Sequence, residues 1–293
     1  MKLAFLSGKG GVGKSMLCSS LAVLFSKEFK ILALDCDVDC PNLEIWLGEE
    51  EKTPQKIIPF FGAQKPVFDY KKCKKCKICI KTCRFSAIKE VEGKPFLNPF
   101  LCEGCGACEI ACPQGAIKMK KIQNAKIEIK KTRYGFFLIT GKLFPGKKGS
   151  GRIVDRVKKE SENFSYDLAL IDSSPGTGCP VISTIKDIDF SLLVCEPTLS
   201  SFEDLKKILK LIKHFKVPYK IVINKWTINP KISFKIKKWA QDKFLGKISY
   251  DKEMMRRLSF GKSILEKDSK IKNEIERVYK KVKVWLDLKN QER

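Results

Sequence analysis

Residues 2–15, KLAFLSGKGGVGKS, decide the fold of the chain. An apolar run, Leu3 to Leu6, leads into a glycine-rich loop, and a helical pattern follows over residues 16–25. The loop has the form G-x-x-x-x-G-K-S, in which glycines let backbone N–H groups surround a phosphate. In this motif Lys14 brings charge to the phosphates and the Ser15 hydroxyl can bind Mg²⁺. Since the strand and the helix are the context that the motif requires, the stretch predicts an ATP-binding α/β domain.

A second lysine, Lys9, follows Gly8 directly, where an ordinary P-loop needs no charge. With this lysine, GKGGVGKS resembles the deviant P-loop of MinD/ParA-type ATPases, a superfamily that includes the nitrogenase iron protein and the Mrp-type iron–sulfur carriers. The resemblance implies that Lys9 reaches across a dimer interface to the partner's nucleotide. It also implies catalytic roles for Lys9 and Lys14, and nucleotide contacts from Gly8, Gly10, Gly11, Val12, Gly13, Lys14, Ser15 and Met16.

Acidic residues end two further apolar runs, and acids at the carboxyl ends of strands are where α/β sheets place their chemistry. Asp35 and Asp37 follow the run over residues 31–34, and Asp172 ends the run over residues 166–172. The resemblance implies that Asp35 and Asp172 support Mg²⁺ together with Ser15, and that Asp37 orients the attacking water. For Asp35 and Asp37, a turn capped by Asp and Asn is the structural alternative.

Asn224 follows another apolar run, Tyr219 to Ile223. In the family that this chain resembles, an asparagine at this strand end bonds adenine, so Asn224 is the predicted base-recognition residue. A turn-forming asparagine is the alternative. The remaining apolar patterns predict a strand over 190–195, a helix over 203–215 and a final helix with an apolar stripe at Ile271, Ile275, Val278, Val282 and Trp285. This final helix is expected to pack on the sheet, and a membrane-targeting helix, as at this end of MinD proteins, is the alternative.

Cysteines follow a repeated pattern in the middle of the chain. Two C-x2-C-x2-C-x3-C runs occur, and every cysteine of the first recurs 29 residues later, as does the sequence Ala-Ile-Lys that trails each run. In two-cluster ferredoxins the fourth cysteine of each run binds the other cluster. The pattern therefore predicts one [4Fe–4S] cluster on Cys73, Cys76, Cys79 and Cys112, and another on Cys83, Cys102, Cys105 and Cys108.

These runs predict an inserted domain. Zinc would want two C-x-x-C pairs separated by a longer spacer, and the one departure from the ferredoxin pattern, Arg84 in place of proline, removes no ligand. We therefore expect a P-loop ATPase fold with a mostly parallel sheet flanked by helices, in two parts, 1–66 and 121–293. A small α+β ferredoxin-like domain over 67–120 interrupts it.

Five cysteines lie outside the runs, and one of them, Cys179, follows Asp172 at seven residues. The nitrogenase iron protein has a cluster ligand at this distance, but the second cysteine that would match that protein's other ligand is lacking here. A buried packing thiol is therefore the favoured interpretation of Cys179.

The formal net charge of +25 is spread along the whole chain of 293 residues. Such a charge could serve to bind nucleic acid, anionic lipid or an acidic protein. The favoured interpretation is a lysine-rich surface that is simply solvated. The first residues enter a strand directly and no apolar run reaches membrane-spanning length, so a cytoplasmic protein with reduced cysteines is expected.

Two functions remain open. In the first, which we favour, ATP hydrolysis by a homodimer or a heterodimer gates electron transfer, or delivery of an iron–sulfur or metal cluster, to an acceptor protein. In the second, the chain is a ParA-like positioning ATPase on DNA or membrane, and its clusters sense redox state or stiffen the inserted domain.

Overall fold

The computed structural model describes residues 1–48, 53–253, 256 and 263–291. It divides into two compact units: unit 1 comprises Met1–Ile57, Ile127–Lys142 and Ser150–Arg293, and unit 2 comprises Ile58–Lys126 and Leu143–Gly149. Unit 2 contains both cysteine runs. It is wider than the predicted insert, 67–120, because the strands on either side of the runs pair with each other and belong to the same unit.

The main sheet has nine strands in the order β13-β12-β11-β1-β10-β2-β9-β8-β3. From β13 to β9 every neighbouring pair is parallel, which agrees with the predicted fold class. The strands are β1 (Lys2–Leu6), β2 (Ile31–Cys36), β3 (Lys56–Phe60), β8 (Ala125–Lys131), β9 (Phe137–Leu143), β10 (Leu168–Ser173), β11 (Phe190–Cys195), β12 (Tyr219–Ile223) and β13 (Phe244–Lys247).

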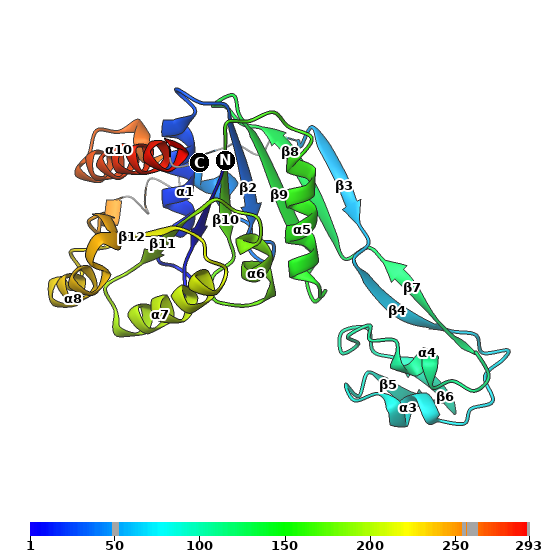
Figure 1. The fold of residues 1–293 in the computed structure, drawn as a ribbon. Coiled ribbons are helices and arrows are strands. Elements are labelled where there is room, and N and C mark those ends of the chain that lie inside the picture. Colours follow the sequence, from blue (N-terminus) through cyan, green and yellow to red (C-terminus); the bar gives the residue numbers. More distant parts are fainter. Residues whose placement is uncertain (49–52, 254–255, 257–262, 292–293) are drawn as a thin grey trace. The chain divides into compact units, whose positions relative to one another are not determined.

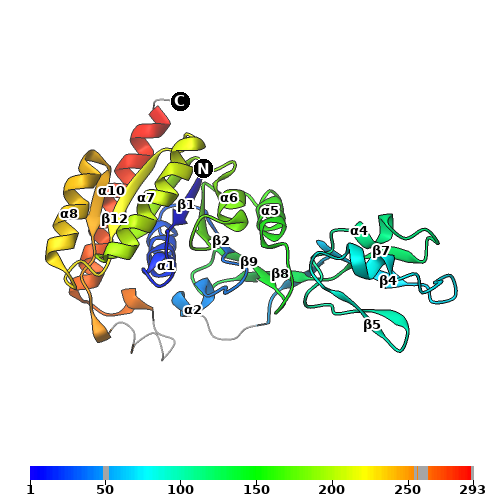
Figure 2. The same ribbon diagram turned by 90° about the horizontal axis from the view of Figure 1, so that it is seen from below.

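Helices cover both faces of this sheet in unit 1 (Figures 1 and 2). Helices α1, α2 and α10 lie on one face, and α5, α6, α7 and α8 lie on the other. Their bounds are α1 (Lys14–Phe25), α2 (Leu43–Trp46), α5 (Ser150–Ser161), α6 (Cys179–Ile185), α7 (Leu199–His214), α8 (Pro230–Ala240) and α10 (Lys270–Gln291), with 3₁₀ turns at Gln241–Lys243 and Ile264–Glu266.

The core of unit 1 follows from its apolar runs. Strands β1, β2, β10 and β11 are buried on both faces apart from the first residue of β1, as expected of parallel strands between two helical layers. Helix α1 is buried along its whole length, because its residues are small or apolar and α10 packs against it. The apolar stripe of α10 lies in the same core, which confirms that the final helix packs within the fold.

Two helices differ from the sequence prediction. Helix α7 begins at Leu199 rather than Glu203, because the Thr198 side chain accepts a hydrogen bond from the Ser201 amide at 3.2 Å and caps the helix earlier. Helix α8 was not predicted, although Asn229 caps it in the same way and Pro230 occupies its first position.

Unit 2 is a small α+β structure. Its elements are β4 (Ala63–Phe68), α3 (Ile78–Thr82), β5 (Ile88–Val91), β6 (Lys94–Leu97), α4 (Ala107–Ile110) and β7 (Ile117–Ile122). The pairs β4–β7 and β5–β6 are antiparallel. Its core centres on Cys79, Ile88, Cys108 and Ile117, of which the last two repeat the first two along the sequence.

In the described part of the chain, no helix is both long and apolar enough to cross a membrane.

Candidate functional site

The P-loop lies between β1 and α1 and forms one wall of a pocket of about 360 Å³. Two glycines are required there by close approach. A side chain at Gly13, whose φ is +90°, would lie 2.0 Å from the Asn224 amide nitrogen, and one at Gly8 would lie 2.2 Å from the backbone oxygen of Asp204. Residues 10–16 of the predicted contacts line the pocket, whereas Gly8 and Lys9 do not appear in its wall.

Lys14 lies near three acids, Asp35, Asp37 and Asp172, which come from two distant parts of the sequence. Its Nζ lies 2.5 Å from Asp172 Oδ1, and both side chains are almost completely buried. Burial alone lowers the pKa of Lys14, but the Asp172 carboxylate, with smaller effects from Asp37 and Asp35, raises it above the ordinary value. Register explains the arrangement, since Asp35 on β2 pairs with Asp172 on the neighbouring strand β10. The P-loop lysine is therefore held by a buried acid in this structure.

Asp35 is anchored by backbone. Its two carboxylate oxygens accept hydrogen bonds from the amides of Asp37, at 3.1 Å, and Leu43, at 2.9 Å. Burial, followed by the charge of Asp172, raises the pKa of Asp35 to about 8. Burial also raises the pKa of Asp37, which lines the pocket directly. Asp35 is thus placed to hold the loop at residues 37–43, while Asp37 faces the pocket.

Three buried polar atoms around the pocket have no hydrogen-bond partner among the residues that the structure describes: Asp172 Oδ2, Asn42 Oδ1 and Ser7 Oγ. Leaving buried polar atoms unsatisfied is costly, so they indicate a ligand. An oxygen-binding cation such as Mg²⁺, with its waters and a polyphosphate, fits this oxygen-rich set together with the Ser15 hydroxyl. These residues are the ones that would hold the ion.

Lys9 is held on its own subunit. Its Nζ lies 3.1 Å from Glu196 Oε1, and Lys225 Nζ lies 2.8 Å from Glu196 Oε2. Lys225 also donates to the Gly11 carbonyl at 2.8 Å. Partial burial of Glu196 opposes ionisation, but the bonds from Lys225 and Lys9 lower its pKa. The sequence did not single out Glu196 or Lys225, because their contact with the P-loop arises only when β11 pairs with β1 and β12 pairs with β11.

Asn224 lines the pocket, yet its side chain bonds the P-loop. Its Nδ2 donates to the Val12 carbonyl and its Oδ1 accepts from the Lys225 amide, each at 2.8 Å. Its predicted bond to adenine stays a prediction. Besides Lys225, the lining residues that were not among the predicted site residues are Ser7, Asn42, Trp46, Pro175, Ser249, Tyr250 and Asp251. Those from 249 onwards follow β13 at the carboxyl edge of the sheet, which is the signal that could have identified them.

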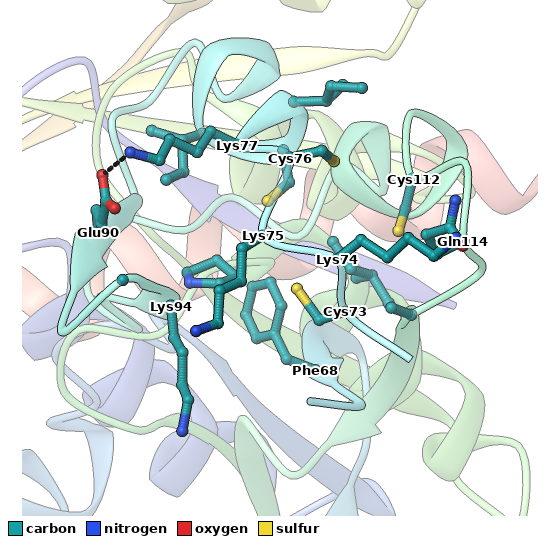
Figure 3. Close-up of a pocket in the computed structure, with 17 residues that line it drawn as sticks. Phe68, Cys73, Lys74, Lys75, Cys76, Lys77, Glu90, Lys94, Cys112 and Gln114 are labelled. Atoms are coloured by element: carbon teal, nitrogen blue, oxygen red, sulfur yellow. Dashed lines mark ion pairs between the residues drawn. The ribbon is translucent and has the colours of Figure 1, made fainter. Parts of the chain in front are cut away.

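Unit 2 groups the eight repeated cysteines around two cavities. One is lined by Cys73, Cys76, Cys79 and Cys112 (Figure 3), and the other by Cys83, Cys102, Cys105 and Cys108. Within the described residues, no three His, Cys, Asp or Glu side chains converge as the ligands of a single metal ion do. Four thiols around a cavity instead fit a larger iron–sulfur group.

The two cysteine runs share an unusual backbone. Residues 75, 77 and 86 have positive φ, and so do residues 104, 106 and 115, each 29 positions later. The second run uses glycine at these positions, but the first uses Lys75, Lys77 and Ser86. Amides of these loops donate to sulfur, Ala87 to Cys83 at 3.3 Å and Gly104 to Cys102 at 3.4 Å. In iron–sulfur sites, hydrogen bonds to the ligand sulfurs help to set the reduction potential.

The cysteines outside the runs divide by burial. Cys18, Cys36 and Cys195 are buried, and burial raises the pKa of Cys195 to about 12, so they are inert packing thiols. Cys179 is exposed, as the first residue of α6. The interpretation of Cys179 as a buried packing thiol is therefore wrong, because the turn of residues 174–178 ends at the surface before α6 turns inward.

Comparison with known proteins places this pocket in a family context. The family model described as "CobQ/CobB/MinD/ParA nucleotide binding domain" matches residues 3–264. An uncharacterized protein of Methanocaldococcus jannaschii is 37% identical over 287 residues, which cover 98% of each chain. The solved structure of the cell division ATPase MinD from Pyrococcus furiosus superposes with a TM-score of 0.60 at 16% identity, covering 97% of this chain and 98% of that one.

Two further relatives have names that refer to iron–sulfur proteins. An iron–sulfur cluster carrier protein of Methanocaldococcus jannaschii is 25% identical over 224 residues, covering 74% of this chain and 57% of its own. An uncharacterized ferredoxin of the same organism is 48% identical over 42 residues, covering 14% of this chain and 25% of its own.

Proposed function

Because this chain belongs to the CobQ/CobB/MinD/ParA family of nucleotide-binding domains and is a P-loop ATPase, we propose that it couples ATP hydrolysis to the chemistry of two iron–sulfur clusters in unit 2. The coupled event is electron transfer, or delivery of a cluster, to an acceptor protein. The observation that carries the proposal is the grouping of the eight repeated cysteines around two cavities.

The nucleotide half rests on the pocket at the P-loop. On nucleotide binding, Lys14 would leave the Asp172 carboxylate and bind the β- and γ-phosphates. The released Asp172 carboxylate would then interact with Mg²⁺ and its waters. Asp37 is the group that would orient the attacking water. Lys9 would leave Glu196 to reach the nucleotide of a second protomer, so hydrolysis would require a dimer, either of two copies or with a related ATPase.

The cluster half rests on the donor set. Cys79 and Cys108 are buried thiols, and burial raises the pKa of Cys108 to about 11, so a thiolate there needs a nearby positive charge. Iron provides that charge and would bind the two cysteine groups as two [4Fe–4S] clusters, which supply one-electron chemistry. The similarity to a protein named ferredoxin supports the same assignment.

Two measurements test this proposal. Anaerobically purified protein should contain about eight irons per chain and, after dithionite, give the EPR signals of reduced [4Fe–4S] centres. Reoxidation by an acceptor should depend on MgATP. Zinc in place of iron, or iron for a single cluster, would refute the cluster assignment. Salt-sensitive, ATP-dependent binding to DNA or anionic vesicles without any effect of redox state would favour the positioning ATPase instead.

A further inference from the structure

The two cysteine runs differ sharply in charge. Residues 71–84 contain six lysines, one arginine and no acid, whereas the equivalent residues 100–113 contain two glutamates and no base. The backbone is the same at the positions with positive φ, so loop geometry does not require the difference. Lys75 and Lys77 even occupy left-handed conformations that their glycine counterparts adopt without strain. The lysines therefore serve something other than the fold.

We define the lysine patch as Lys74, Lys75, Lys77 and Lys94, the lysines that line the cavity of Cys73, Cys76, Cys79 and Cys112 (Figure 3). All four are exposed, and so is Cys76 between them. Lys77 forms an ion pair with Glu90 at 2.8 Å, and Lys94 lies over the Tyr70 ring at 5.8 Å. Within the described part of the chain, neither Lys74 nor Lys75 forms an ion pair. Most of the charge of the patch is thus uncompensated.

The chemistry of the cavity indicates what this charge does. Positive charge near an iron–sulfur group stabilises its reduced, more negative form, so an electron shared by the two sites collects at the one beside the lysine patch. Cys76 brings the edge of that site to solvent, where an electron can leave. The same charge attracts a negatively charged protein surface and raises the rate of productive encounters by roughly 10- to 1000-fold at low salt.

We propose that the lysine patch is the docking surface for an acidic one-electron acceptor protein, served by the site of Cys73, Cys76, Cys79 and Cys112. In the docked complex one electron leaves the reduced site and enters the oxidised cofactor of the acceptor, with no bond or proton transferred. This inference rests on the proposed function. Nucleic acid fits this surface less well, because specific contacts to bases and phosphates prefer the forked arginine side chain, and the cationic residues that line this cavity are all lysines.

The chain provides its own substitutions for a test. Lys74→Glu, Lys75→Gly and Lys77→Gly introduce the residues found 29 positions later, at Glu103, Gly104 and Gly106, so the backbone tolerates them. Lys231→Glu with Lys235→Glu, two exposed positions of α8, changes the net charge by the same amount and is the control. The probe is an acidic flavodoxin, whose flavin accepts one electron at a time.

For dithionite-reduced wild-type protein, the stopped-flow rate of flavodoxin reduction should fall as salt is raised. The triple variant should react about tenfold more slowly at low salt and lose this salt dependence, while the control stays within about twofold of wild type. Calorimetric titration of the two oxidised proteins should show the same order of affinities. Equal rates and affinities for all three proteins would overturn the docking surface.

The same experiment distinguishes a different ligand for the patch from a failure of the proposed function. If the triple variant reduces flavodoxin normally but loses binding to a short DNA duplex or to phosphatidylglycerol vesicles, the patch serves that ligand and the proposal is wrong. Iron content is measured on every sample. A wild-type protein without iron refutes the proposed function itself, whereas full iron loading with rates insensitive to the patch refutes this inference alone.

Discussion

At the residue scale, two residues of the pocket are expected to serve different steps, ATP binding and ATP turnover. Lys14 and Asp37 both line the pocket, and Lys14 is buried against Asp172. We expect Lys14→Ala to abolish ATP binding, and Asp37→Ala to keep binding within a few-fold but lower kcat at least 100-fold, on the scale of a lost water-positioning group. Equilibrium titration with a fluorescent ATP analogue and a phosphate-release assay measure the two effects. Asp37→Ala protein with normal turnover would remove Asp37 from catalysis.

The trans role of Lys9 calls for a different experiment, since the lysine is held by Glu196 of its own chain. Lys9→Ala and Asp37→Ala proteins should each be inactive. Mixed in equal amounts, they should recover roughly a quarter of wild-type activity, because half of the dimers are mixed and each mixed dimer has one complete site. Without any recovery, Lys9 acts within its own chain or the dimer does not form.

At the element scale, the two cysteine loops share one backbone but not the same strain. Ser86 has φ +49°, and its counterpart Gly115 has φ +59°. We expect Ser86→Gly to stabilise unit 2 by up to about 1 kcal/mol and the reciprocal change Gly115→Ser to destabilise it by about 1–2 kcal/mol, the cost of a left-handed conformation. Anaerobic urea unfolding, followed by cluster absorbance, measures both. Changes of the same sign in the two variants would show that the turn is not under this constraint.

At the scale of the whole molecule, the two units differ in what holds them together. The sheet of unit 1 is covered on both faces by helices, whereas the core of unit 2 contains few apolar side chains besides its cysteines. Small domains with so little core depend on metals or disulfides. We therefore expect iron removal by a chelator to unfold unit 2 and leave ATP binding by unit 1 nearly unchanged.

Limited proteolysis and nucleotide titration of the iron-free protein test this expectation together. Cleavage should concentrate in residues 58–126, and the affinity for ATP should stay within about threefold of the loaded protein, since the pocket is made by unit 1 alone. If unit 2 resists the protease without iron, its fold does not need the clusters.

The sequence by itself determined the features that short motifs encode. The P-loop predicted β1, α1 and the parallel sheet, because a glycine-rich turn between strand and helix has few other uses. The cysteine spacing predicted which thiols share a site, and the cavities group the same residues, since the repeat forces each fourth cysteine towards the other run. Helix α8 and the N-terminal cap of α7 could also have been predicted from local sequence signals, namely Asn229 followed by Pro230, and Thr198.

Only the tertiary structure decided which side chains the sheet brings together. Strand pairing puts Asp35 beside Asp172, and the order of strands brings Glu196 and Lys225 to Lys9. The bounds of unit 2 and the exposure of Cys179 were likewise decided in three dimensions. The physical reason is that a sequence motif is formed by residues that are close together in the chain. These contacts instead join residues that are far apart in the chain, and such residues meet only after the strands between them have packed.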